Sequence, residues 1–123
     1  MSLSARRVLF RACFTFTLLV ITWLAVTPDP PGGIDLVGDK WNHSFAFIVL
    51  ALLADFSFPS LGWINWLGLA CYGIALECIQ WSLDYRYFEW NDVLADLLGI
   101  ALYLVLRPLI NRIQCLRELR AGE

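Results

Sequence analysis

Charged side chains are scarce in this sequence: Asp, Glu, Lys and Arg make up 16% of its 123 residues, whereas apolar residues make up 59%. Soluble domains carry about 25% charged residues, so this balance is not that of an ordinary soluble protein. The chain also lacks a Gly-rich phosphate loop, a G-x-S-x-G elbow, an H-E-x-x-H motif and a basic stripe. These absences exclude the usual nucleotide, serine-hydrolase and zinc-protease signatures and predict no nucleic-acid partner.

Long apolar segments are what the sequence has instead. A helix needs about 20 residues to cross a bilayer. Four segments have this length: roughly Val8–Thr27, Asp39–Phe58, Ile64–Leu83 and Asn91–Ile110. The first resembles a signal peptide, but no A-x-A cleavage site follows it, so we expect it to remain as a crossing. We predict an all-α fold over residues 1–123, an integral membrane four-helix bundle with a tail at 111–123.

Basic residues gather toward the two ends of the chain. The arginines there are Arg6, Arg7, Arg11, Arg107, Arg112, Arg117 and Arg120. Basic residues mark the cytoplasmic side of membrane proteins, so we expect both termini and the tail to be cytoplasmic. Termini on one side require an even number of crossings, in agreement with four segments.

Three of the segments carry polar residues at helical spacing, which places them on one face of each helix. The three stripes are Asp39, Asn42, His43 and Ala46; Gly73, Glu77, Gln80 and Asp84; and Asp92, Asp96, Gly99 and Tyr103. The expected topology puts each stripe at the outer end. From the helical rise, His43, Glu77 and Asp96 would lie about 6–10 Å below the interface. We therefore expect an outward-facing polar pocket between the second, third and fourth helices.

The expected pocket has more carboxylates than fixed cations. Its charged members are Asp39, Glu77, Asp92 and Asp96 against Lys40, Arg86 and the titratable His43. An ionised carboxylate near the centre of a membrane helix costs roughly 3 kcal/mol on insertion scales. Either some carboxyls are protonated, or the site receives a cation, a metal ion or an ammonium group.

His43, Glu77 and Asp96 are the candidate catalytic residues. His43 is open to three interpretations: a structural partner of a carboxylate, a proton-transfer group, or a metal ligand with Glu77 and Asp96. The two carboxylates either perform the function, as intramembrane carboxylates usually do, or only tie the helices together. Whether a metal ion or another cofactor binds stays open.

Five further residues are candidate binding residues: Asp39, Lys40, Gln80, Arg86 and Asp92. We expect Gln80 to hydrogen-bond between helices and to orient Glu77. Arg86 can grip a phosphate or carboxylate, or neutralise a nearby acid. Asp92 can instead cap its helix, and Asp39 can pair with Lys40 or cap the second helix.

Other polar and small residues are expected to be structural. Asp55 belongs to this group, and Gly73 and Gly99 are expected to allow close approach of helices. The arginines from Arg107 to Arg120 are expected to anchor the last helix at anionic lipid, with a partner-binding cytoplasmic helix as the alternative.

The order of these motifs resembles the VanZ-like family. The resemblance rests on D-K-x-x-H at Asp39–His43, E-x-x-Q at Glu77–Gln80, Arg86, and D-x-x-x-D-x-x-G at Asp92–Gly99. It implies a small, multi-pass protein of the bacterial inner membrane with about four helices. The founding member of that family is linked to teicoplanin resistance, which suggests a role in the cell envelope.

Three functions are compatible with these observations. The first is recognition of an envelope lipid or cell-wall precursor headgroup, with or without catalysis. The second is a non-enzymatic, transporter-like or partner-binding bundle, for which loss of the polar residues would lower abundance and activity together. The third is a metal-dependent membrane hydrolase, which would contain stoichiometric metal.

Overall fold

The computed structural model describes residues 2–27, 39–83, 90–113 and 118, with positions 3 and 39–41 described by their backbone alone. Within these ranges the chain forms four α-helices and no strand. The helices are α1 (Leu3–Val26), α2 (Asp39–Ser57), α3 (Trp63–Trp81) and α4 (Trp90–Arg112), and a short 3-10 helix, η2 (Pro59–Leu61), joins α2 to α3. For the described residues, the prediction of an all-α fold with four helices is confirmed.

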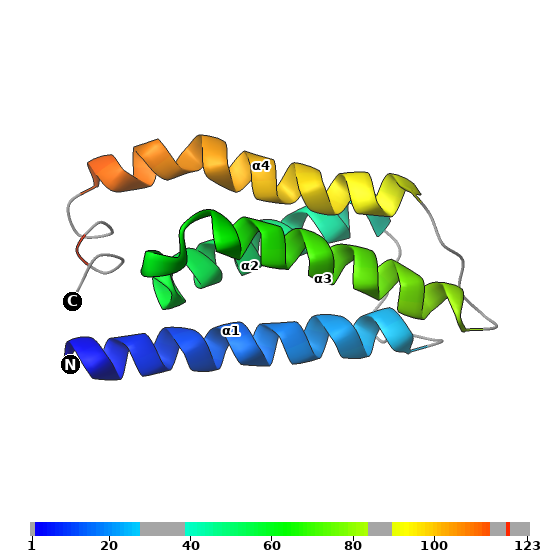
Figure 1. Cartoon of the computed structure of the whole chain (residues 1–123), viewed down its shortest axis with the longest axis horizontal. Coiled ribbons are helices and arrows are strands. Elements are labelled where there is room, and N and C mark those ends of the chain that lie inside the picture. The colour runs from blue at the N-terminus through cyan, green and yellow to red at the C-terminus, as the bar shows by residue number, and fades with distance from the viewer. Residues whose placement is uncertain (1, 28–38, 84–89, 114–117, 119–123) are drawn as a thin grey trace.

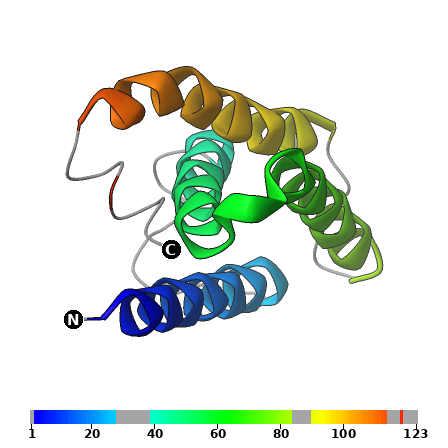
Figure 2. The same ribbon diagram turned by 60° about the vertical axis from the view of Figure 1, so that its left-hand side comes forward.

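The helices alternate in direction, as Figure 1 shows: α1 and α3 run one way, and α2 and α4 run the other. The bundle therefore has two ends. We call the end that contains Leu3, Ser57, Trp63 and Arg112 the proximal end, and the end that contains Val26, Asp39, Trp81 and Trp90 the distal end. Figure 2 shows α2 in the middle, and it packs against each of the other three helices.

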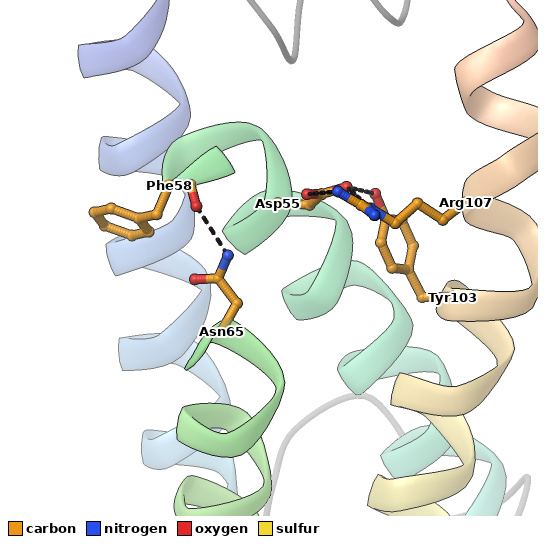
Figure 3. A network of polar contacts seen from close by, with 5 residues as sticks. All are labelled: Asp55, Phe58, Asn65, Tyr103 and Arg107. Atoms are coloured by element: carbon orange, nitrogen blue, oxygen red, sulfur yellow. Dashed lines mark hydrogen bonds and ion pairs between the residues drawn. The ribbon is translucent and has the colours of Figure 1, made fainter. Parts of the chain in front are cut away.

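A tight turn at the proximal end sets α3 antiparallel to α2. Gly62 has a φ of +57°, a left-handed conformation that glycine adopts without the steric cost of a Cβ atom. The amide Nδ2 of Asn65, in the first turn of α3, donates a hydrogen bond of 2.9 Å to the carbonyl of Phe58 (Figure 3). This bond closes the connection, so a turn of few residues fixes the direction of α3.

The apolar core surrounds α2. Its fully buried side chains include Phe47, Leu50 and Ala51 of α2, which pack with Leu69 of α3 and Ile100 of α4. Gly99 explains the close contact between α2 and α4, because a Cβ atom there would meet the backbone oxygen of Ser44. This confirms the expectation that Gly99 allows close helix approach.

The outer faces of the helices are strongly apolar. The side chains of Phe16, Trp63 and Val105 are 68%, 68% and 74% exposed, and many other large apolar residues are exposed as well. Two helices, Ser4–Val26 of α1 and Trp90–Arg112 of α4, are long and apolar enough to cross a membrane, whereas the apolar part of α2 is shorter. The sequence predicted four such segments. The polar side chains near the distal ends of α2 and α3, His43, Glu77 and Gln80 among them, shorten the apolar stretch of both.

A polar network joins α2 to α4 in the proximal half (Figure 3). Asp55, 1% exposed, accepts a hydrogen bond of 2.6 Å from the Tyr103 hydroxyl and pairs with the Arg107 guanidinium through bonds of 2.9 and 3.3 Å. The structural role expected of Asp55 is confirmed. The expectation for Arg107 needs correction, because its guanidinium pairs with Asp55 inside the bundle and is not held free for lipid.

Two further arginines bind the proximal end of α2. Arg7 donates to the carbonyl of Phe56 at 3.2 Å, and Arg11 donates to that of Ser57 at 3.1 Å. The last carbonyls of a helix lack intrahelical partners and carry partial negative charge, so cations stabilise them. The arginines near the N-terminus therefore also hold α1 against α2.

Candidate functional site

Four polar side chains from three helices meet near the distal end. We call them the distal polar cluster: His43 of α2, Glu77 of α3, and Asp92 and Asp96 of α4. Glu77, Asp96 and Asp92 are 0%, 1% and 7% exposed, and the side chain of His43 is 20% exposed. The most accessible member of the cluster is thus the imidazole, and the carboxylates lie behind it within the bundle.

His43 and Asp96 form a direct hydrogen bond between α2 and α4. Nδ1 of His43 lies 2.8 Å from Oδ1 of Asp96. When Asp96 is ionised, its carboxylate can only accept hydrogen bonds, so Nδ1 carries the proton and donates it. When the imidazole is neutral, this bond leaves Nε2 as the ring nitrogen with a lone pair for another partner.

Glu77 and Asp92 lie close to the same imidazole. One ligand atom from each of His43, Glu77 and Asp92 lies within 4.8 Å of the others. Carboxylates this close together repel each other when both are ionised, unless positive charge or hydrogen-bond donors compensate them. One imidazole nitrogen and two carboxylate oxygens in this arrangement form a donor set that could hold a cation.

Small residues let the three helices approach at this level. A Cβ atom at Gly73 of α3 would lie 2.8 Å from Oδ2 of Asp96, so the carboxylate packs directly on the backbone of α3. Gly73 thus allows close approach, as expected. The hydroxyl of Ser44, next to His43, donates a hydrogen bond of 2.9 Å to the carbonyl of Ala95, next to Asp96. These contacts fix the positions from which His43 and Asp96 meet.

Gln80 hydrogen-bonds between helices, as the sequence suggested, but its partner lies on α1. Its amide nitrogen, Nε2, donates a hydrogen bond of 2.9 Å to the carbonyl of Ala25 and so ties the distal end of α3 to that of α1. No hydrogen bond between Gln80 and Glu77 appears among the described side chains. The amide therefore anchors the helix that carries Glu77.

Three of the sequence candidates lie wholly or partly outside the description. Asp39 and Lys40 begin α2 at the distal end, and their side chains are not described; Arg86 lies outside the described residues. Sequence spacing also misplaced one residue. Tyr103 belongs to the same stripe as Asp92 and Asp96, but its hydroxyl binds Asp55 in the proximal half.

The three residues that could hold a metal ion are His43, Glu77 and Asp92, which differ from the set that sequence spacing suggested. Sequence reasoning grouped His43 with Glu77 and Asp96 as the possible metal ligands. In the structure Asp92 completes that trio, and Asp96 binds the imidazole. Spacing places both aspartates on one face of α4, but only the packing of α4 against α2 decides which of them meets Glu77.

Comparison with known proteins gives one informative match. No protein-family model matches the chain, and no solved structure matches it. The uncharacterized protein C11E3.10 of Schizosaccharomyces pombe is 31% identical over 118 residues, which cover 90% of this chain and 71% of the yeast protein.

This match corrects two predictions. The relative is eukaryotic, and no family model supports the resemblance to the VanZ-like family. The assignment to that family was therefore wrong, and so was the bacterial inner membrane that it implied. The link to antibiotic resistance came from the same resemblance and has no support. The motifs misled because spacings such as D-x-x-x-D and E-x-x-Q are those of one helix face, which any bundle with buried carboxylates shares. The chain belongs to the same family as the uncharacterized protein C11E3.10 of fission yeast.

Proposed function

We propose that the protein crosses a membrane with all four helices and binds the polar headgroup of a phospholipid at the distal polar cluster. The observation that carries this proposal is the burial of Glu77, Asp92 and Asp96 beside a single, partly exposed imidazole. Buried carboxylates in a membrane bundle are costly and are usually retained for binding or proton transfer.

The apolar exterior supports the membrane part of the proposal. Soluble monomers rarely expose continuous apolar surface of this extent. Here large apolar side chains are exposed on all four helices, among them Leu19 of α1, Phe45 of α2, Leu67 of α3 and Leu98 of α4. A bilayer would cover these faces.

The arginines support the proposed orientation. Arg6, Arg7 and Arg11 lie at the start of α1, and Arg107 and Arg112 lie in the last turns of α4. Both groups belong to the proximal end, which we propose faces the cytoplasm. The distal polar cluster then opens toward the opposite side of the membrane.

The negative charge of the cluster supports binding of a headgroup that carries a positive charge. Three carboxylates and one imidazole suit an ammonium group, as in phosphatidylethanolamine. We propose Lys40 and Arg86 as contacts for the phosphate. Lys40 is the second residue of α2, and Arg86 precedes α4 in the sequence. Phosphatidylglycerol, which has the phosphate but no ammonium, is the matched comparison.

Native mass spectrometry in mild detergent tests the proposal. We expect the wild type to retain added phosphatidylethanolamine and the Glu77→Gln variant to lose it, because the amide keeps the shape of the side chain but not its charge. Cys78→Ser is the control: Cys78 follows Glu77 on α3, but its side chain is exposed, whereas that of Glu77 is buried. Preference for phosphatidylethanolamine over phosphatidylglycerol would identify the ammonium group as the recognised part.

Equal lipid retention by the wild type and a folded Glu77→Gln variant would contradict the proposal. It would favour the alternative in which the cluster only joins the helices. In that case substitutions should lower the amount of folded protein in the membrane and leave no separate binding defect.

A further inference from the structure

We propose that His43, Glu77 and Asp92 form a site for one divalent transition-metal ion, with Asp96 as the residue that orients the imidazole. The three side chains come from α2, α3 and α4, so the site exists only in the folded bundle. This inference goes beyond lipid binding and does not require it.

The donor set is the first argument. One imidazole nitrogen and two carboxylate oxygens lie within 4.8 Å of one another, close enough for one ion to reach all three after small rotations of the side chains. A carboxylate has two oxygens and about four lone-pair positions, so each can hold a metal ion and still accept a hydrogen bond. A hydrogen bond that either carboxylate already accepts therefore does not prevent it from binding the ion.

The contact between His43 and Asp96 also resembles that of a metal-binding histidine. Histidine ligands of metal ions almost always donate their other ring N–H to a carboxylate or carbonyl, which fixes the tautomer and the ring orientation. Nδ1 of His43 makes such a bond with Oδ1 of Asp96 at 2.8 Å. The nitrogen left for a metal ion is Nε2.

The burial of Asp96 strengthens this argument. Asp96 is 1% exposed, and its Oδ2 has no hydrogen-bond partner among the described residues. A buried carboxylate is stabilised when the imidazole it contacts carries positive charge or binds a cation. A metal ion on Nε2 would supply that charge on the far side of the imidazole ring.

The ligand types indicate which ion fits. One imidazole with two carboxylates suits Zn²⁺, Mn²⁺ or Fe²⁺ better than Ca²⁺ or Mg²⁺, which prefer oxygen ligands alone. Three protein ligands leave at least one coordination position open, as in catalytic rather than structural zinc sites. A water molecule could take that position.

Metal content of the purified protein tests the site. The chain should carry an affinity tag without histidine, be stripped with EDTA in mild detergent and be titrated with Zn²⁺ and with Mn²⁺. Inductively coupled plasma mass spectrometry after desalting should give about one ion per wild-type chain. The Glu77→Gln and Asp92→Asn variants should lose the ion, whereas Cys78→Ser should retain it.

Asp96→Asn separates the orienting role from ligation. Loss of such a partner typically weakens metal binding about 10–100-fold without abolishing it. We expect this variant to bind Zn²⁺ at raised concentration, and circular dichroism should show that every variant keeps its helices. If Asp96→Asn lowers the Zn²⁺ affinity less than Glu77→Gln does, Asp96 is an orienting residue. An equal loss of affinity in the two variants would indicate that Asp96 is itself a ligand and would overturn the assignment.

The proposal does not depend on the variants alone. A folded wild type that binds neither Zn²⁺ nor Mn²⁺ in the titration would overturn it, and so would equal binding by the wild type and Glu77→Gln. Metal content and lipid retention are measured separately, so metal binding can fail while headgroup binding holds, and the reverse.

Discussion

His43 and Asp96 are joined by a hydrogen bond of 2.8 Å that links the middle helix, α2, to α4. The two residues are 53 positions apart in the sequence, and each belongs to a stripe of polar residues on its own helix. Their contact turns two separate stripes into one cluster. It also engages Nδ1 of the imidazole, so the position of Nε2 depends on how α2 packs against α4.

Gly99→Ala should disturb the site without touching any of its polar groups. The added Cβ atom would meet the backbone oxygen of Ser44 and lie 3.0 Å from Cβ of Phe47, so α2 and α4 must move apart. We expect a loss of about 1–3 kcal/mol in the free energy of unfolding, as for other overpacked sites. Denaturation in mild detergent, followed by circular dichroism, measures this change.

Gly68→Ala is the matched control for that substitution. Gly68 also lies within a helix, and a Cβ atom there would have nothing within 4 Å. Alanine favours a helix over glycine by about 1 kcal/mol, so we expect unchanged or raised stability. Equal destabilisation by both substitutions would mean that close packing of α2 on α4 is not the cause.

Asp55→Asn should destabilise the proximal half of the bundle. The carboxylate binds both Tyr103 and Arg107, and its loss leaves the arginine without its negative partner. Breaking a buried pair costs about 3 kcal/mol, and because the Arg107 side chain is 33% exposed we expect no more than that. The midpoint of denaturation should fall, while lipid retention by the remaining folded protein should be unchanged.

Arg112→Gln is the comparison for the Asp55 variant. Arg112 ends α4, and its side chain is exposed. A surface charge of this kind contributes little, about 0–1 kcal/mol. A comparable loss of stability in both variants would contradict the role assigned to the buried network.

The proposed topology predicts that tags on the two termini report the same side of the membrane. Protease treatment of sealed vesicles, in which the cytoplasmic side faces out, should remove both tags at the same concentration. A tag inserted between α3 and α4 should be protected until detergent is added. Removal of one terminal tag and protection of the other would indicate an odd number of crossings and would contradict four spans.

The sequence predicted the helices well because their signal is local. Apolar segments of about 20 residues, interrupted by Pro and Gly, indicated all four, and the bounds of α2 differ from the expected segment at its end by one residue, Ser57 against Phe58. The roles of Gly73 and Gly99 also followed from position alone, because small residues on a polar stripe lie where helices meet.

The details of the site required the tertiary structure. Helical spacing shows that Asp92 and Asp96 share a face, but the rotation of α4 about its own axis decides that Asp92 lies beside Glu77. Spacing likewise cannot show that Tyr103 contacts Asp55, since this depends on the tilt of α4 across α2. Contacts between residues on different helices are set by packing, and no local pattern encodes them.

The most direct test of headgroup binding uses the single histidine of the chain. With ¹⁵N-labelled histidine and a tag that contains none, the imidazole of His43 gives one pair of nitrogen resonances. We predict that phosphatidylethanolamine, added to the protein in mild detergent, shifts these resonances in a saturable way, and that Glu77→Gln greatly reduces the shift. Resonances that stay unchanged at saturating lipid, in a folded wild type, would contradict binding at the distal polar cluster.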